Sequence, residues 1–105
     1  MTPVIITRAT DFPQEKSMID REIEKNIHGK LDAYLKKFTT LESETRIETT
    51  LTRDTKKNER LNTTYSGKVE IRINGKSFLA KRENYEKLED LINHLFTHIK
   101  TQMGK

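Results

Sequence analysis

Hydrophobic and polar residues alternate most regularly in the segment 68–81. Its first half has the two-residue period of a strand with one buried face, and the apolar positions are Val69, Ile71 and Ile73. Asn74-Gly75 follows, and Asn-Gly supplies the two positive φ angles of a type I′ turn. This turn would place Ile71 opposite Phe78 and leave Leu79 as the one apolar residue on the polar face. We therefore predict a β-hairpin whose register is fixed.

Two other segments have the composition or the period of strands. Residues 4–7 are a run of β-branched side chains directly after Pro3. Between Arg46 and Arg53 the side chains alternate again, with one face made by Ile47, Thr49 and Leu51. The charged run 53–60 that follows is most simply a solvated hairpin tip.

Two longer segments show the period of an amphipathic helix. In the first, an apolar residue recurs at every fourth position: Ile19, Ile23, Ile27, Leu31 and Leu35. Ser17 and Asp20 predict its N-terminal cap, and it should end near Phe38. In the second, Asn84 predicts the N-cap, with Glu86 in the first turn. The apolar positions of the second helix are Leu88, Leu91, Ile92, Leu95, Ile99 and Met103.

The order of these elements is β-α-β-β-β-α. A right-handed crossover would set the first strand parallel to the second, with both helices packed on one face of a four-stranded mixed sheet. The sequence thus predicts an α+β fold in a single domain over residues 1–105. We expect a core built from Ile23, Ile27, Leu31, Phe38, Ile71, Phe78, Leu88, Leu95 and Ile99.

Composition agrees with a small folded domain and excludes several classes. Leu, Ile, Val and Phe make up 25 of the 105 residues, which lies above the roughly 20% below which chains tend to be disordered. Cysteine is absent, so neither a disulfide framework nor a cysteine metal site is possible. The first residues lack the basic region of a signal peptide, and no apolar run approaches the roughly 20 residues that cross a bilayer. We expect a cytoplasmic protein without a membrane partner.

A net charge of +4 favours a polyanionic partner. On a helical wheel, Lys30 and Lys37 share one flank of the first helix with Asn26, while Lys25 and Lys36 lie further out on its solvent side. The second helix has a flank made by Lys87, His94 and His98. Two helices side by side could merge these flanks into a basic groove for a phosphate backbone. A chain with 34% charged residues also produces such basic flanks by chance, so a helical wheel alone does not decide whether the groove exists.

Catalytic and metal sites find little support. His94 and His98 have the spacing that lets two imidazoles face one metal, but His28 lies on the other helix and a site normally needs three or four ligands. No serine stands in a nucleophile motif, and no carboxylate pair has a recognisable apolar setting. Gly75 belongs to a turn, so there is no glycine-rich phosphate loop. We expect no enzyme activity, no metal, no cofactor and no small-molecule substrate.

Three short motifs lie at the ends of the predicted helices and in the hairpin turn. Residues 30–38 read Lys-Leu-Asp-Ala-Tyr-Leu-Lys-Lys-Phe, Glu83-Asn84-Tyr85 precedes the second helix, and Asn74-Gly75 marks the hairpin turn. With the element order, they resemble the short ribosome hibernation promoting factors, also called ribosome-associated inhibitor A or sigma-54 modulation proteins. That family has a Lys-Leu-x-x-Leu-x-Lys-x-Phe-like run and an acid-x-Tyr step at the matching places. Its dense Arg/Lys segment at the end of the second helix is replaced here by residues 97–105.

The resemblance implies a ribosome-binding domain that recognises the small ribosomal subunit and its 16S-type rRNA in the channel used by mRNA and tRNA. Translation would then be silenced under stress or in stationary phase. This function requires only shape and basic side chains that meet rRNA phosphates. The RNA-binding candidates are Lys25, Lys30, Lys36, Lys37, Lys81, Arg82, Lys87, His94, His98 and Lys100.

Two other functions stay open. A double-stranded RNA-binding domain also packs two helices on a sheet, although its lysine cluster at the start of the second helix is replaced here by Tyr85-Glu86-Lys87. A protein-interaction adaptor would instead use the open face of the sheet, where Leu79 would be exposed. Sedimentation with ribosomes separates these functions from a hibernation factor.

Overall fold

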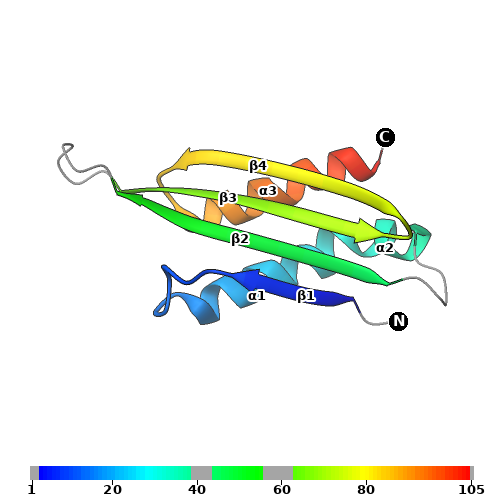
Figure 1. Cartoon of the computed structure of the whole chain (residues 1–105), viewed down its shortest axis with the longest axis horizontal. Helices are drawn as coiled ribbons and strands as arrows, with labels where there is room; N and C mark the ends of the chain where they lie inside the picture. The colour runs from blue at the N-terminus through cyan, green and yellow to red at the C-terminus, as the bar shows by residue number, and fades with distance from the viewer. Residues whose placement is uncertain (1–2, 39–43, 56–62, 105) are drawn as a thin grey trace.

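A computed structural model describes residues 3–38, 44–55 and 63–104, apart from the side chains of residues 37, 38 and 55. The elements follow the predicted order (Figure 1). The strands are β1 (Val4–Arg8), β2 (Thr45–Thr55), β3 (Thr63–Ile73) and β4 (Lys76–Tyr85). The helices are α1 (Lys16–Asn26), a π-helical turn η1 (Ile27–Leu31), α2 (Asp32–Phe38) and α3 (Leu88–Met103). Most of the predicted charged tip lies outside the described residues.

The four strands form one sheet in the order β1-β2-β3-β4. β1 runs parallel to β2, whereas β3 runs antiparallel to both of its neighbours, β2 and β4, as expected. Ile71 lies opposite Phe78, and the turn residues Asn74 and Gly75 have φ angles of 50° and 77°. Both the hairpin register and its turn are therefore confirmed. Leu79 is 42% exposed, which confirms it as the misfit of the polar face.

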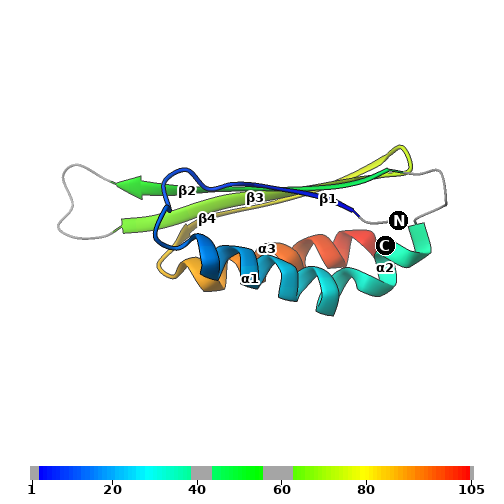
Figure 2. The same cartoon turned by 90° about the horizontal axis from the view of Figure 1, so that it is seen from below.

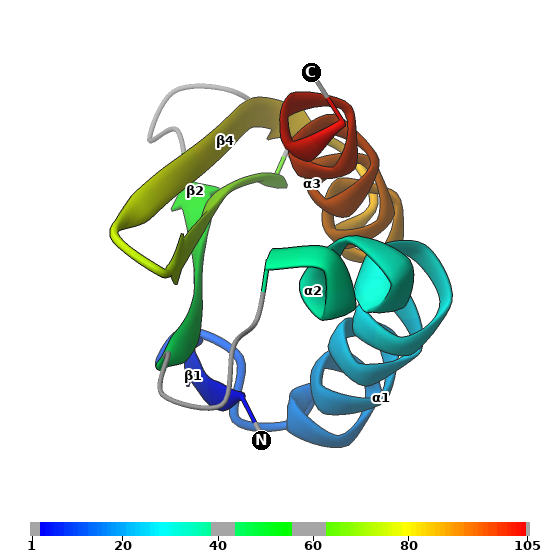
Figure 3. The same cartoon turned by 90° about the vertical axis from the view of Figure 1, so that its right-hand side faces the viewer.

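All the helices cover the same face of the sheet (Figure 2). Seen end-on, α1 with α2 forms one rod and α3 another, and the two rods lie side by side (Figure 3). The opposite face of the sheet is bare in both views. The α+β prediction, with a four-stranded mixed sheet and helices on one side, is confirmed.

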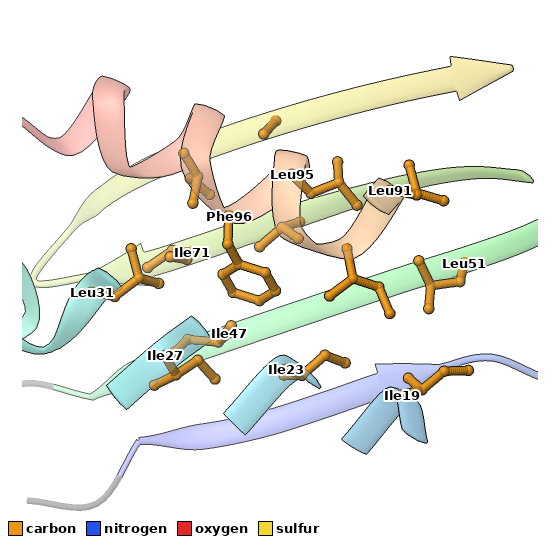
Figure 4. Close-up of a cluster of buried hydrophobic side chains, with 14 of the residues drawn as sticks. Ile19, Ile23, Ile27, Leu31, Ile47, Leu51, Ile71, Leu91, Leu95 and Phe96 are labelled. Atoms are coloured by element: carbon orange, nitrogen blue, oxygen red, sulfur yellow. The ribbon is translucent and has the colours of Figure 1, made fainter. Parts of the chain in front are cut away.

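The core fills the layer between sheet and helices (Figure 4). Seven predicted core residues are buried: Ile23, Ile27, Leu31, Ile71, Leu88, Leu95 and Ile99. Phe78 is only partly buried at the edge of this cluster, and the side chain of Phe38 lies outside the described set. Two buried aromatic residues, Phe12 and Phe96, were absent from the predicted core. Phe12 lies in the connection after β1, whose composition indicated only a polar loop.

Both predicted helix caps are wrong. α1 starts one residue before Ser17, and its N-cap Glu15 makes no side-chain capping bond. The buried Phe12, whose N–H bonds the carbonyl of Ala9 at 3.0 Å, fixes where the chain enters the helix. Asn84 stays in β4 with a φ of 62°, a left-handed conformation that Asn tolerates better than most residues. The N-cap of α3 is Lys87, and the acidic residues of its first turn are Glu89 and Asp90.

Gly67 lets the sheet and α3 approach closely. A Cβ at this position would lie 2.9 Å from Leu51 Cδ2 and 3.1 Å from Leu95 Cδ1, both of which are core atoms. The register of β3 against β4 also shifts between Tyr65 and Gly67. A side chain here would push α3 away from the sheet.

Candidate nucleic-acid interface

Polar side chains join the two helical rods where α1 and η1 meet α3. Asn26 is buried, and its Nδ2 donates to the carbonyl of Glu22 at 2.7 Å and to Asn93 Oδ1 at 2.9 Å. Asn93 Nδ2 in turn donates to the carbonyl of Glu89 at 2.9 Å. These bonds fix the position of one rod against the other. We call this region the interhelical junction; its side chains are Lys25, Asn26, Lys30, Asn93 and Lys100.

A π-helical turn lies beside this junction. The apolar residues of α1 recur at every fourth position, and each such step rotates by about 40° around an ideal α-helix. Over the stretch from Ile19 to Leu31 this drift would carry the stripe away from the core. The wider turn Ile27–Leu31 rotates by a smaller angle per residue, which reduces the drift. Both of its end residues accordingly remain buried. Lys30 lies within this turn and reaches α3.

Lys30 is the lysine of the junction whose ammonium group is fixed by a hydrogen bond to the other helix. Its Nζ donates to the backbone carbonyl of Asn93 at 3.1 Å. Burial lowers the pKa of Lys30, and the positive charges of Lys100 and Lys25 lower it further, while Glu22 opposes the shift. Lys25 and Lys100 therefore both lie close enough to repel the charge of Lys30. We call these three residues the junction lysines.

Glu22 places a negative charge beneath these lysines. Its side chain is 4% exposed, and within the described residues Oε2 has no hydrogen-bond partner. One carboxylate opposite three ammonium groups leaves the junction with an excess of positive charge. An anion at the surface would lower the mutual repulsion of the junction lysines.

The other lysines predicted on the first helix contribute differently. Lys36 forms an exposed ion pair with Asp32 at 3.0 Å, one helical turn away, so its charge is partly offset. Lys37 lies in α2, and its side chain is outside the described set. The structure thus adds neither of them to the junction.

His94 and His98 lie on the other flank of α3, which faces β4. Nδ1 of His94 is 2.8 Å from Tyr85 Oη, and the two rings meet edge to face. Nε2 of His98 is 3.2 Å from Gln102 Nε2, and its buried Nδ1 has no partner among the described residues. Gln102 also exchanges hydrogen bonds with both backbone groups of Leu79. These two histidines therefore lie on the side of α3 away from the first helix.

The remaining candidates lie away from the junction. Lys81 projects from the open face of the sheet, opposite Lys68 on β3. Arg82, the next residue of β4, lines the same shallow hollow as Lys81. Lys87 precedes α3 and borders a second hollow with Tyr85 and Asp90. The sequence pattern did not indicate Asn93, whose only signal is a polar residue at the edge of the apolar stripe.

Within the described ranges, no group of three or more His, Cys, Asp or Glu side chains is arranged to hold a metal ion. In the same part of the chain, no helix has the length and apolar character needed to span a bilayer.

The fold has a counterpart among solved structures. The chain is similar to the N-terminal domain of Protein Y from Thermus thermophilus, with a TM-score of 0.64 over 98% of this chain and 96% of that chain. The two sequences are 14% identical. The likeness is one of fold. No family model matches the chain, and no curated protein matches it in sequence.

Proposed function

We propose that this chain is a ribosome-associated translation inhibitor that binds the small ribosomal subunit. The junction lysines would contact rRNA phosphates in the channel used by mRNA and tRNA. The observation that carries the proposal is the convergence of Lys25, Lys30 and Lys100 at a rigid meeting point of two helices. No chemical step is part of this function.

The fold supports the same proposal. Protein Y belongs to the ribosome hibernation family that the sequence motifs resemble. The motif at residues 30–38 begins with Lys30, which is the lysine that contacts α3. Lys30 thus belongs both to the motif that resembles the family and to the lysines of the interhelical junction.

The junction is arranged to favour a bound phosphate over free solution. Lys30 is held by the Asn93 carbonyl, so little side-chain freedom remains to be lost on binding. A phosphate beside the junction lysines would stabilise the charge of Lys30, which is partly desolvated and is repelled by Lys25 and Lys100. Contacts of this kind position RNA by its backbone rather than by its sequence.

The adaptor alternative is less well supported. The exposed large hydrophobic side chains among the described residues are Val4, Ile5 and Leu79. Leu79 lies on β4 and the other two on β1, at opposite edges of the sheet. They do not form the contiguous apolar patch that a protein-binding surface normally has.

Co-sedimentation with ribosomes in a sucrose gradient tests the proposal. The wild-type chain should travel with small subunits, and Lys30→Glu with Lys100→Glu should remain at the top of the gradient. Lys16→Glu with Lys76→Glu changes the net charge equally at two exposed positions outside the junction and should still travel with the subunits. Absence of the wild-type chain from every ribosomal fraction would overturn the function.

A further inference from the structure

One row of side chains crosses all four strands on the open face of the sheet. Arg8 lies opposite Thr50, Thr50 opposite Lys68, and Lys68 opposite Lys81. Directly opposed residues project from the same face, and strands lie about 4.8 Å apart, so the row is about 14 Å long. The neighbouring Val69 points into the core, which places the row on the face without helices.

The charges of the adjoining rows are largely paired. Arg46 contacts Glu48 at 2.8 Å, and Arg72 contacts Glu70 at 3.0 Å. Arg8 shares Glu48 at a longer 3.9 Å. Lys68 and Lys81, by contrast, form no ion pair with any described residue. The unbalanced positive charge of this face is thus concentrated at one opposed pair of lysines.

Two lysines directly opposite one another destabilise a sheet unless something separates or neutralises their charges. Beside them is a shallow hollow of about 220 Å³. Its lining brings together hydroxyl groups, two lysines, one arginine and one carboxylate: Thr50, Thr52, Ser66, Gly67, Lys68, Lys81, Arg82 and Glu83. The Thr52 hydroxyl donates to the carbonyl of Ser66 at 3.4 Å, and the Ser66 hydroxyl donates to Asp54. The donors left for a phosphate oxygen are the Thr50 hydroxyl and the cationic groups of Lys68, Lys81 and Arg82.

We propose that this hollow is a second phosphate-binding site, centred on Lys68 and Lys81, that takes the RNA backbone on the face opposite the interhelical junction. The proposal rests on the proposed ribosomal function for the identity of the polyanion. It implies that the chain lies between two RNA segments rather than on the surface of one. Neither the helical junction nor the shared fold requires this second contact.

Nuclear magnetic resonance of the ¹⁵N-labelled chain tests the site directly, with a short oligouridine as the probe. Amide signals of Thr50, Lys68 and Lys81 should shift in a saturable way, separately from those of Asn26 and Asn93. Shifts confined to the junction would overturn the second site and leave the proposed function intact. An equal response to inorganic phosphate at the same concentration would assign the site to free phosphate and overturn its assignment to RNA.

Affinity for the same oligouridine, measured by fluorescence anisotropy, supplies a second test. Lys68→Gln with Lys81→Gln should weaken binding and reduce the slope of log affinity against log salt by about 1.4, at 0.7 per lost phosphate contact. The control Lys16→Gln with Lys76→Gln removes equal charge and should keep the wild-type slope. An unchanged slope in the Lys68 and Lys81 variant would contradict the site.

The ribosome gradient keeps the two proposals apart. If the wild-type chain fails to sediment with ribosomes while oligouridine still shifts Lys68 and Lys81, the ribosomal function fails and the phosphate site stands. If the chain sediments normally and the Lys68 and Lys81 variant sediments equally well at every salt concentration, the site has no part in ribosome binding and the proposal fails.

Discussion

The two flanks of α3 carry polar side chains of similar appearance in the sequence, yet they have different surroundings. On the flank toward α1, Lys30 bonds the Asn93 carbonyl, is partly desolvated and is repelled by the charge of Lys100. On the flank toward β4, His94 and His98 are within hydrogen-bond distance of Tyr85 and of Gln102. The first flank has an excess of positive charge, whereas polar groups of the second flank hold α3 to β4.

The flank toward β4 differs because one of its polar side chains bonds the backbone of the neighbouring strand. Gln102 contacts the N–H and the carbonyl of Leu79, so it occupies the outward backbone groups at the edge of β4. Edge strands with free backbone groups can pair with other chains, and a side chain in this place prevents it. The flank toward α1 therefore differs from the flank toward β4 by its unbalanced charge rather than by polarity alone.

Aromatic residues on the two sides of α3 offer the largest expected effect. Phe96 is fully buried, and Figure 4 places its ring between α3 and the side chains of Ile23 and Ile27. Phe96→Ala should cost about 3–5 kcal/mol in urea-induced unfolding, because it leaves a cavity between the rods. Phe78→Ala, on the β4 side, should cost clearly less, since its ring is already partly exposed. Equal losses would mean that the two sides are packed alike.

Gln102→Ala should have the next largest effect. It removes the side chain that bonds both backbone groups of Leu79, and the free energy of unfolding should fall by about 1 kcal/mol. Sedimentation with ribosomes should not change, because the β4 flank has no part in the proposed contact. A loss of ribosome binding in a variant that is still folded would contradict this division between the flanks.

Lys30→Met tests whether Lys30 is needed for the stability of the fold. The pKa of Lys30 lies below its ordinary value of 10.5, chiefly because of burial. The native chain therefore releases this proton before the unfolded chain does as pH rises, and stability increases from the lowered pKa up to about 10.5. The variant should be no less stable than wild type near neutral pH and should lack this contribution. Chemical denaturation across the alkaline range measures both, and a marked loss of stability would show that the lysine is structural.

The histidines should have the smallest effect. His94→Gln with His98→Gln leaves the junction lysines in place, so ribosome affinity should match that of wild type between about pH 6 and about pH 7.5, the range in which an ordinary imidazole titrates. Affinity that rises on acidification in wild type and not in the variant would return the histidines to the binding surface.

Local patterns predicted the elements that depend on local chemistry. The register of the hairpin follows from Asn74-Gly75 and from the alternation around it, and both hold in the structure. The helix caps failed because tertiary packing decided where the helices begin. Burial of Phe12 fixes the start of α1, and continuation of β4 through Asn84 delays α3.

The candidate site was predictable only in part. A helical wheel correctly set Asn26 and Lys30 on one flank of the first helix, which is the flank that meets α3. A wheel shows which side chains share a flank, but it does not show which element that flank will face. Lys100 and His94 were both RNA-binding candidates, although α3 directs one toward α1 and the other toward β4.

The salt dependence of binding to small ribosomal subunits tests the central claim most directly. For the wild-type chain, log affinity should fall linearly with log salt concentration, because phosphate contacts release counterions. Lys30→Gln with Lys100→Gln should bind more weakly and show a slope that is shallower by about 1.4, at 0.7 per lost phosphate contact. A variant with the wild-type slope and the wild-type affinity would contradict the claim that the interhelical junction binds rRNA.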